Sequence, residues 1–208
     1  MKWKQFSKFI SPEKYSNIHS NRDTISQLVI HRGQVEQVKT TTHKWYPKDV
    51  KNNDWVEGYR YVDMNHSYFG SDALILSEAS CCVILLLLDS QSNRKFSAHI
   101  CATSDLKSLN WLRMQFDLKC FFKSINYNLS RAENYFFSNN LYKDGDGSFE
   151  QRNVMRLLLS AFTENQLRYI ASCSHFIEGE NGNRWNPRCA IRLGDENKHQ
   201  AMNISFAH

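Results

Sequence analysis

The segment Ser80-Cys81-Cys82-Val83-Ile84-Leu85-Leu86-Leu87-Leu88-Asp89 contains the longest apolar run of the chain, and Asp89 ends it. A continuous run of Val, Ile and Leu is typical of a strand that is buried on both faces. A polar turn with the sequence DSQSNRK follows, and Phe96–Ala102 then has the composition of a second strand. We therefore predict that the two segments pair as a hairpin.

This hairpin would bring a thiol and an imidazole together. When the second strand folds back, the start of the first strand lies next to the end of the second, and Cys82 comes beside His99. An imidazole next to a thiol is the usual means of forming a thiolate at neutral pH. The pair is therefore a candidate nucleophile and general base. The alternative is a purely structural role, since Cys is among the most buried residue types.

The flanking segments alternate between strand and helix patterns, which predicts an α/β or α+β layered domain. Residues 1–24 suit a short helix or an extended arm. A helix is predicted over Ser104–Asp117, and another follows the capping box Ser148–Gln151. The face of the first helix would consist of Leu106, Leu109, Leu112 and Phe116. Strands are predicted at Ile25–Ile30, Val35–Thr42, Lys119–Ile125, Tyr169–Ser174 and Cys189–Leu193.

Residues 44–71 hold seven aromatic residues among charged residues and Asn. Two interpretations fit this composition. The segment is a hairpin excursion with a half-buried aromatic face, or it is a partner-binding surface, because Trp and Tyr dominate interface anchors.

Composition bounds the class of protein. The chain has 208 residues, of which 41% are hydrophobic and 23% charged, enough for one domain with a real core. The net charge of +5 allows an acidic partner. No apolar run approaches a membrane span, and the N-terminal residues are unlike a secretory signal, so we expect a soluble cytoplasmic protein. The six cysteines form no C-x-x-C motif, so we expect free thiols and no metal site.

The segment Ser80-Cys81-Cys82-Val83, the apolar run, Asp89 and then Ala98-His99 resemble the chemotaxis receptor glutamine deamidases, the CheD family. That family has Gly-Ser-Cys-Val, an apolar strand, Asp-Pro, a short turn and then His. Gln151-Arg152-Asn153-Val154 is similar to its Gly-Glu-Arg-Asn-Val, and His31-Arg32-Gly33-Gln34 to its His-Pro-Gly-Glu. Gly70-Ser71-Asp72 resembles a motif of the eukaryotic protein N-terminal asparagine amidohydrolase.

The resemblance implies the layered α/β/α sandwich with mixed sheets that is also found in bacterial toxins that deamidate host glutamines. It covers residues 29–195, with an aromatic insertion at about 36–70. Residues 1–28 would then be an N-terminal extension, and residues 196–208 a C-terminal tail.

The resemblance also implies site residues. Cys82 would be the nucleophile and His99 the general base and acid, and the backbone N–H groups of Cys81 and Cys82 would stabilise the oxyanion. The family's third catalytic residue is a Thr six positions before the Cys, where this chain has Leu76. Ser77 and Ser80 are the nearby hydroxyls that would take its role. Cys81 stands in place of the family's Ser and is an alternative nucleophile.

The expected function is cysteine-dependent deamidation of a glutamine or asparagine carboxamide in a protein partner, without metal or cofactor. The site of action would be the bacterial cytoplasm, or the host cytosol for a delivered effector. One alternative is a catalytically idle relative that only binds a partner protein, which the missing Thr favours. A third is a nucleic-acid-binding module, which ranks last because no dense basic stripe or aromatic RNA motif is present.

Overall fold

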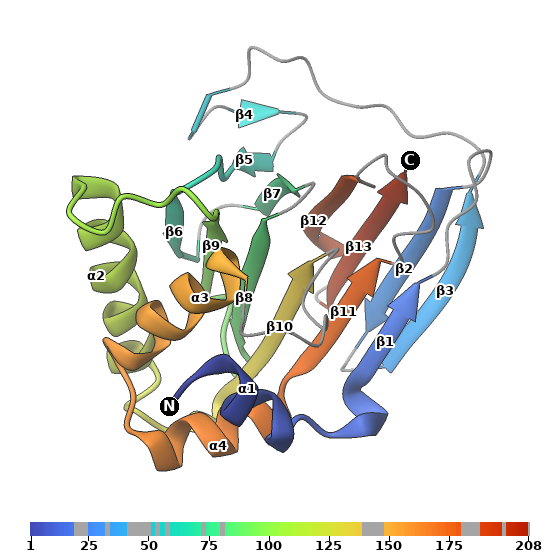
Figure 1. Cartoon of the computed structure of the whole chain (residues 1–208). Coiled ribbons are helices and arrows are strands. Elements are labelled where there is room, and N and C mark those ends of the chain that lie inside the picture. The colour runs from blue at the N-terminus through green and yellow to red at the C-terminus, as the bar shows by residue number, and fades with distance from the viewer. Residues whose placement is uncertain are drawn as a thin grey trace.

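The computed structural model describes residues 1–18, 25–31, 34–40, 51–52, 55–56, 59–71, 74–79, 82–138, 148–179, 188–196 and 199–207. Two sheets form the body of this part of the chain (Figure 1). The first has six strands in the order β1 (Tyr15–Ile18), β11 (His175–Gly179), β10 (Ala132–Ser138), β8 (Val83–Asp89), β9 (Lys95–Ile100) and β6 (Ser67–Gly70). The second has seven, in the order β3 (Gln34–Thr40), β2 (Ile25–His31), β13 (His199–Ala207), β12 (Arg188–Glu196), β7 (Leu74–Ala79), β5 (Tyr59–Tyr61) and β4 (Trp55–Val56).

Both sheets are mixed. Strand β11 pairs in parallel with β1 and with β10, and β5 pairs in parallel with β7. The remaining pairs are antiparallel, including the predicted hairpin of β8 and β9. Every residue of β8 is buried, as its continuous apolar run predicts for a strand covered on both faces.

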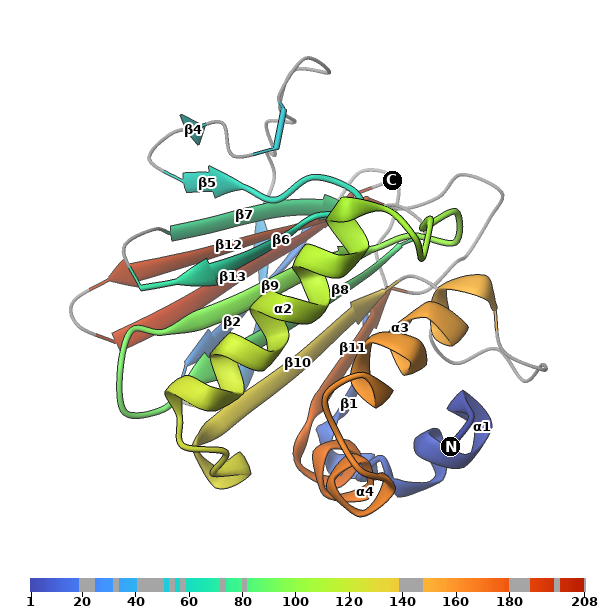
Figure 2. The same cartoon turned by 90° about the vertical axis from the view of Figure 1, so that its left-hand side faces the viewer.

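Helices cover one face of the six-stranded sheet, and the seven-stranded sheet lies on its other side (Figures 1 and 2). The helices are α1 (Trp3–Phe6), α2 (Leu109–Ser124), α3 (Phe149–Leu159) and α4 (Glu164–Cys173). This arrangement confirms the predicted α+β layered class with mixed sheets. In the described residues the layers follow the order helices, sheet, sheet, which differs from the α/β/α order that the resemblance implied, because the second sheet covers the face where a second helical layer would lie.

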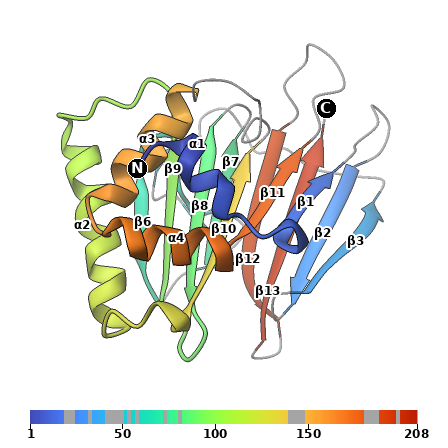
Figure 3. The same cartoon turned by 60° about the horizontal axis from the view of Figure 1, so that its bottom comes forward.

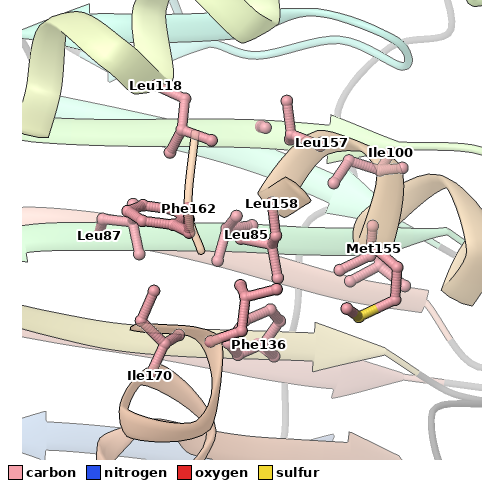
Figure 4. Close-up of a cluster of buried hydrophobic side chains, with 14 of the residues drawn as sticks. Leu85, Leu87, Ile100, Leu118, Phe136, Met155, Leu157, Leu158, Phe162 and Ile170 are labelled. Carbon is pink, nitrogen blue, oxygen red and sulfur yellow. The ribbon is translucent and has the colours of Figure 1, made fainter. Parts of the chain in front are cut away.

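The main core lies between the helices and the six-stranded sheet. Leu85 and Leu87 of β8, Ile100 of β9 and Phe136 of β10 point at side chains of α3 and α4 (Figure 4). Adjacent residues such as Ile84 and Leu86 are equally buried but point to the opposite face. The six-stranded sheet therefore buries both of its faces, one under helices and one toward the second sheet.

The terminal segments belong to this architecture. The sequence set residues 1–28 apart as an extension and 196–208 as a tail. In the structure, Trp3 and Phe6 are core residues, β1 pairs with β11, and β13 lies between β2 and β12. The apolar side chains near the N-terminus are needed to complete the helical layer, because Phe6 packs against both Phe136 and Phe176.

Helix α2 differs from its prediction in length and in orientation. It runs from Leu109 to Ser124, so the strand predicted at Lys119–Ile125 is wrong. The predicted inner face is also wrong, since Leu109, Leu112 and Phe116 are 83%, 53% and 59% exposed. A second apolar stripe on the helix, made of larger side chains, packs against β6 and β9 instead (Figure 2). That stripe consists of Trp111, Met114, Leu118, Phe121 and Phe122.

Two further predictions have clear outcomes. Tyr169–Ser174 is not a strand, because most of it belongs to α4, whose capping box at Thr163 and Gln166 begins a helix. The capping box at Ser148 and Gln151 is confirmed as the start of α3. In the aromatic insertion, β4 and β5 form a short antiparallel pair, while Trp45 and Tyr46 lie outside the described residues.

Candidate functional site

The hairpin register decides how the candidate nucleophile and base are related. Val83 pairs with Ile100 and Ile84 pairs with His99. His99 is therefore directly opposite Ile84, two residues from Cys82, whereas the sequence indicated only that Cys82 lies beside His99. If the register is continued by one residue beyond β8, Cys82 is opposite Cys101 and His99 is its diagonal neighbour. Diagonal neighbours in an antiparallel pair are separated by about 7–8 Å.

The two residues share a face of the hairpin. Side chains alternate along a strand, so Ile84, His99 and, by continuation, Cys82 point away from the helical core and toward the second sheet. Cys82 is 4% exposed and His99 3% exposed. A thiol and an imidazole are thus buried at the same end of the hairpin.

Residues 62–66, between β5 and β6, contact both the backbone and the ring of His99. The His99 backbone N–H donates to the His66 carbonyl at 3.0 Å, and the Asn65 N–H donates to the His99 carbonyl at 2.8 Å. The ring donates a hydrogen bond to the Val62 backbone and interacts electrostatically with Asp63 and His66. A neutral imidazole has one donor and one acceptor nitrogen, so the bond to Val62 sets the ring orientation and leaves the other nitrogen as acceptor.

Burial controls the protonation of His99. Removal from water lowers its pKa to about 4, and His66 acts in the same direction, while the bond to Val62 and the Asp63 charge act in the opposite direction. His99 is consequently neutral at pH 7, in the form that can accept a proton from a thiol. The hydrogen bond to Val62 and the nearby Asp63 carboxylate favour its protonated form.

His66 is held by its own contacts. Its Nδ1 lies 2.9 Å from the Met64 carbonyl and its Nε2 3.1 Å from the Asn110 side-chain amide of α2. This pairing selects the tautomer in which Nδ1–H donates to the carbonyl and Nε2 accepts from the amide. Helix α2 therefore positions the segment that frames His99.

Two anchors hold the ends of the hairpin. At one end, the carboxylate of Asp89 accepts hydrogen bonds from Arg131 Nε at 3.1 Å and from Arg131 Nη2 at 2.6 Å. Burial raises the pKa of Asp89, but the hydrogen bonds to its carboxylate outweigh burial and hold this pKa below its usual range. At the other end, Asn153 Nδ2 of α3 donates to the carbonyls of Cys101 and Ala102 at 2.9 and 3.3 Å. Asn153, in the motif Gln151-Arg152-Asn153-Val154, thus ties α3 to the end of β9.

The other predicted site residues are placed only in part. Ser77 lies in β7, opposite Ile191 of β12, and β7 approaches both β8 and β9. Ser80 and Cys81 lie outside the described residues, so the oxyanion site and the choice between the two thiols stay predictions. Sequence reasoning missed Asp63 and Cys101, because nothing in their spacing indicates that β9 pairs with β6 and adjoins residues 62–66.

Within the described residues, no group of three or more His, Cys, Asp or Glu side chains is arranged to hold a metal ion. No helix in the same ranges has the length and apolar composition required to cross a membrane. Cys82, Cys101, Cys120 and Cys173 are free thiols.

The depressed pKa of His99 predicts a pH-dependent stability. An unfolded chain binds a proton at His99 near pH 6.5, and the folded chain only near pH 4, so the unfolding free energy falls as pH decreases through this window. At pH 4.5 the loss should be about 2 kcal/mol relative to pH 7. Urea denaturation of the wild type and His99→Gln at both pH values measures the difference.

The matched control is His175→Gln, because burial also lowers the pKa of His175, which is less deeply buried and lies near Lys14. We expect His99→Gln to remove most of the pH dependence and His175→Gln to remove a smaller part. Equal slopes in the wild type and His99→Gln would contradict a neutral buried His99.

Comparisons with known proteins identify no family for this chain. No family model matches the chain, and no curated protein sequence matches it. A crystal structure of the Bacillus licheniformis hypothetical protein YfiH is similar at a TM-score of 0.33 and 8% sequence identity. The similarity covers 69% of this chain and 61% of the length of that one. At such a TM-score this is only a weak structural likeness.

Proposed function

We propose that this protein is a cysteine-dependent deamidase that hydrolyses the carboxamide of a glutamine or asparagine in a protein partner. The observation that carries the proposal is the burial of His99 and of Cys82, which directly precedes β8, at the same end of the β8–β9 hairpin. The resemblance to the CheD family, based on the residues around this pair, supports the choice of reaction.

The mechanism follows from the state of each group. Neutral His99 accepts the Cys82 thiol proton, and the thiolate attacks the carboxamide carbon to form a tetrahedral intermediate. His99 returns the proton to the amide nitrogen, and the C–N bond breaks. Ammonia departs, and the acyl group remains on Cys82 as a thioester. His99 then takes a proton from water, the hydroxide attacks the thioester, and the carboxylate product and free thiol are released.

Burial sets the energetic problem of this mechanism. The imidazolium form of His99 is disfavoured in its dry environment, as its low pKa indicates. The carboxylate of Asp63 and the adjacent thiolate offset part of this cost during the reaction. Asp63 is therefore a positioning residue of the proposed site, in addition to the hydroxyls of Ser77 or Ser80. The backbone N–H groups of Cys81 and Cys82 are the proposed oxyanion donors.

A second candidate function is partner binding without catalysis. It is favoured by the outer face of α2, where Leu109, Leu112 and Phe116 are exposed. An exposed apolar patch of this kind commonly marks a protein-binding surface. The same surface would serve a deamidase that recognises a protein substrate. In either case the protein would work in the cytoplasm of a bacterium, or in a host cytosol if it is delivered there as an effector.

Thiol reactivity tests the proposal without knowledge of the substrate. We expect iodoacetamide at pH 6 to modify Cys82 faster than Cys101, because a thiolate forms well below the ordinary thiol pKa of about 8.5 only where a base adjoins it. Cys101 is an apt internal control, since it is 6% exposed against 4% for Cys82 and lies across the hairpin. The readout is peptide mass spectrometry after timed quenching.

His99→Gln completes the test. It should slow modification of Cys82 to the rate of Cys101 and leave the more exposed Cys120 unchanged. Equal rates for Cys82 and Cys101 in the wild type would count against activation and favour the binding function.

A further inference from the structure

A cavity of about 910 Å³ lies between the N-terminal segment and α3, away from the proposed catalytic pair. Figures 2 and 3 both show α1 beside α3, and Trp3 and Met155 belong to the core at this point. The lining consists of apolar side chains, the amide of Gln5 and five cations, with no carboxylate among them. The cations are Lys2, Lys4, Lys8, Arg152 and Arg156.

The cations come from segments almost 150 residues apart in the chain, so the fold itself gathers them. Lys4 and Lys8 are four residues apart, as are Arg152 and Arg156, and like charges at this spacing on a helical segment repel each other. All five cations have exposed side chains. Among the described residues, none of them forms an ion pair with Asp or Glu.

The contacts of the two arginines are with neutral groups. The Arg152 guanidinium lies 4.2 Å from the centre of the Phe149 ring, and Arg156 Nη1 donates to Asn153 Oδ1 at 3.2 Å. These contacts hold the side chains in place but do not neutralise them. A concave surface that concentrates positive charge attracts anions and raises their local concentration.

We propose that this cavity binds a small molecule that carries several phosphate groups. Its phosphates would be held by the five cations, since guanidinium groups match phosphate oxygens in pairs and ammonium groups act as point charges. The rest of the ligand would contact Met1, Trp3 and Leu159. The volume lies within the range of about 300–1,000 Å³ that is usual for small-molecule sites.

The site is independent of the proposed deamidase activity. It lies on the helical side of the six-stranded sheet, whereas His99 points to the other side. Free polyphosphorylated metabolites and the headgroups of polyphosphorylated lipids share the chemistry that the cavity would recognise.

The test uses inorganic triphosphate as the probe, with isothermal titration calorimetry on the full chain at pH 7 and low salt. We expect one triphosphate per chain, with affinity that weakens as salt is added. The triple variant Lys4→Gln, Lys8→Gln, Arg152→Gln should weaken binding by about tenfold or more, because three charge contacts are removed. Without the probe, this variant should melt no lower than the wild type, since repulsion is relieved.

A matched variant separates a built site from net charge alone. Three exposed lysines lie on or beside α2, far in sequence from the residues that line the cavity: Lys107, Lys119 and Lys123. Their replacement by Gln removes three positive charges, as many as the first triple variant does. Triphosphate affinity should be unchanged. An equal loss in both triple variants, or no binding by the wild type, would overturn the proposal.

Two further arms identify the source of the phosphates. Capture by vesicles of phosphatidylcholine with phosphatidylinositol bisphosphate, reversed by triphosphate, supports a lipid headgroup. Triphosphate binding without vesicle capture supports a soluble ligand. Tighter binding of a single-stranded oligonucleotide than of triphosphate, lost in the Lys4, Lys8, Arg152 variant, would overturn the small-molecule assignment and favour nucleic-acid binding.

Discussion

Replacement of Cys82 by Ser is expected to reduce deamidation of the partner protein by at least about a thousandfold, because removal of a covalent nucleophile is among the most damaging changes to an enzyme. Ser lacks the thiol acidity that the neutral His99 would exploit. Candidate partners are co-expressed with the wild type or with the variant, and their peptides are analysed by mass spectrometry for glutamine-to-glutamate and asparagine-to-aspartate changes. A change that requires Cys82 would identify the reaction and its target together.

Cys101→Ser is the matched control for this experiment. It makes the same substitution in an equally buried thiol across the hairpin, so it should retain most of the activity. Thermal melting of both variants checks that the fold is intact. Activity that survives Cys82→Ser but is lost in Cys81→Ser would move the nucleophile to Cys81. A partner that binds the wild type and Cys82→Ser equally and is modified by neither would favour the binding function.

Replacement of Phe136 by Ala is expected to lower the unfolding free energy by about 3–5 kcal/mol, as for other large-to-small changes in a packed core. Phe136 is fully buried, stacks on Phe176 with 4.7 Å between ring centres, and contacts Phe6 edge-on at 6.1 Å. The variant therefore removes contacts with another strand and with the N-terminal helix. Urea denaturation at pH 7 measures the change.

Phe116→Ala provides the control, since the same atoms are removed from the outer face of α2. Its ring is 59% exposed and its close contact is with the Arg113 guanidinium at 5.8 Å. The loss there should be below about 1 kcal/mol. A loss at Phe116 as large as that at Phe136 would contradict the observed orientation of α2 and restore the inner face that the sequence suggested.

The orientation of α2 illustrates why local patterns mislead. Leu109, Leu112 and Phe116 have helical spacing, but so do Trp111, Met114 and Leu118, and spacing alone cannot rank two overlapping stripes. The choice is made by β6 and β9, which offer a surface to only one side of the helix. Similarly, residues 169–174 have strand-like composition, but the capping box at Thr163 starts a helix that includes most of them.

The candidate site shows the same division. A hairpin and a polar turn sufficed to predict that a thiol and an imidazole meet at one end of two strands. Which residue lies directly opposite His99 is set by the register, because a shift of one residue changes which side chains face each other. The environment of His99 needed the pairing of β9 with β6, which brings Val62 and Asp63 from a distant segment.

The sequence by itself determined the buried β8–β9 hairpin, the capped start of α3 and the layered α+β class, because continuous apolar runs and capping residues act over a few neighbouring positions. Only the tertiary structure decided which face of α2 is buried, that the terminal segments complete both sheets, and that Lys2–Lys8 meet Arg152 and Arg156 around one cavity. These features depend on contacts between residues far apart in the chain, and the free energy of such contacts is not encoded in any local spacing.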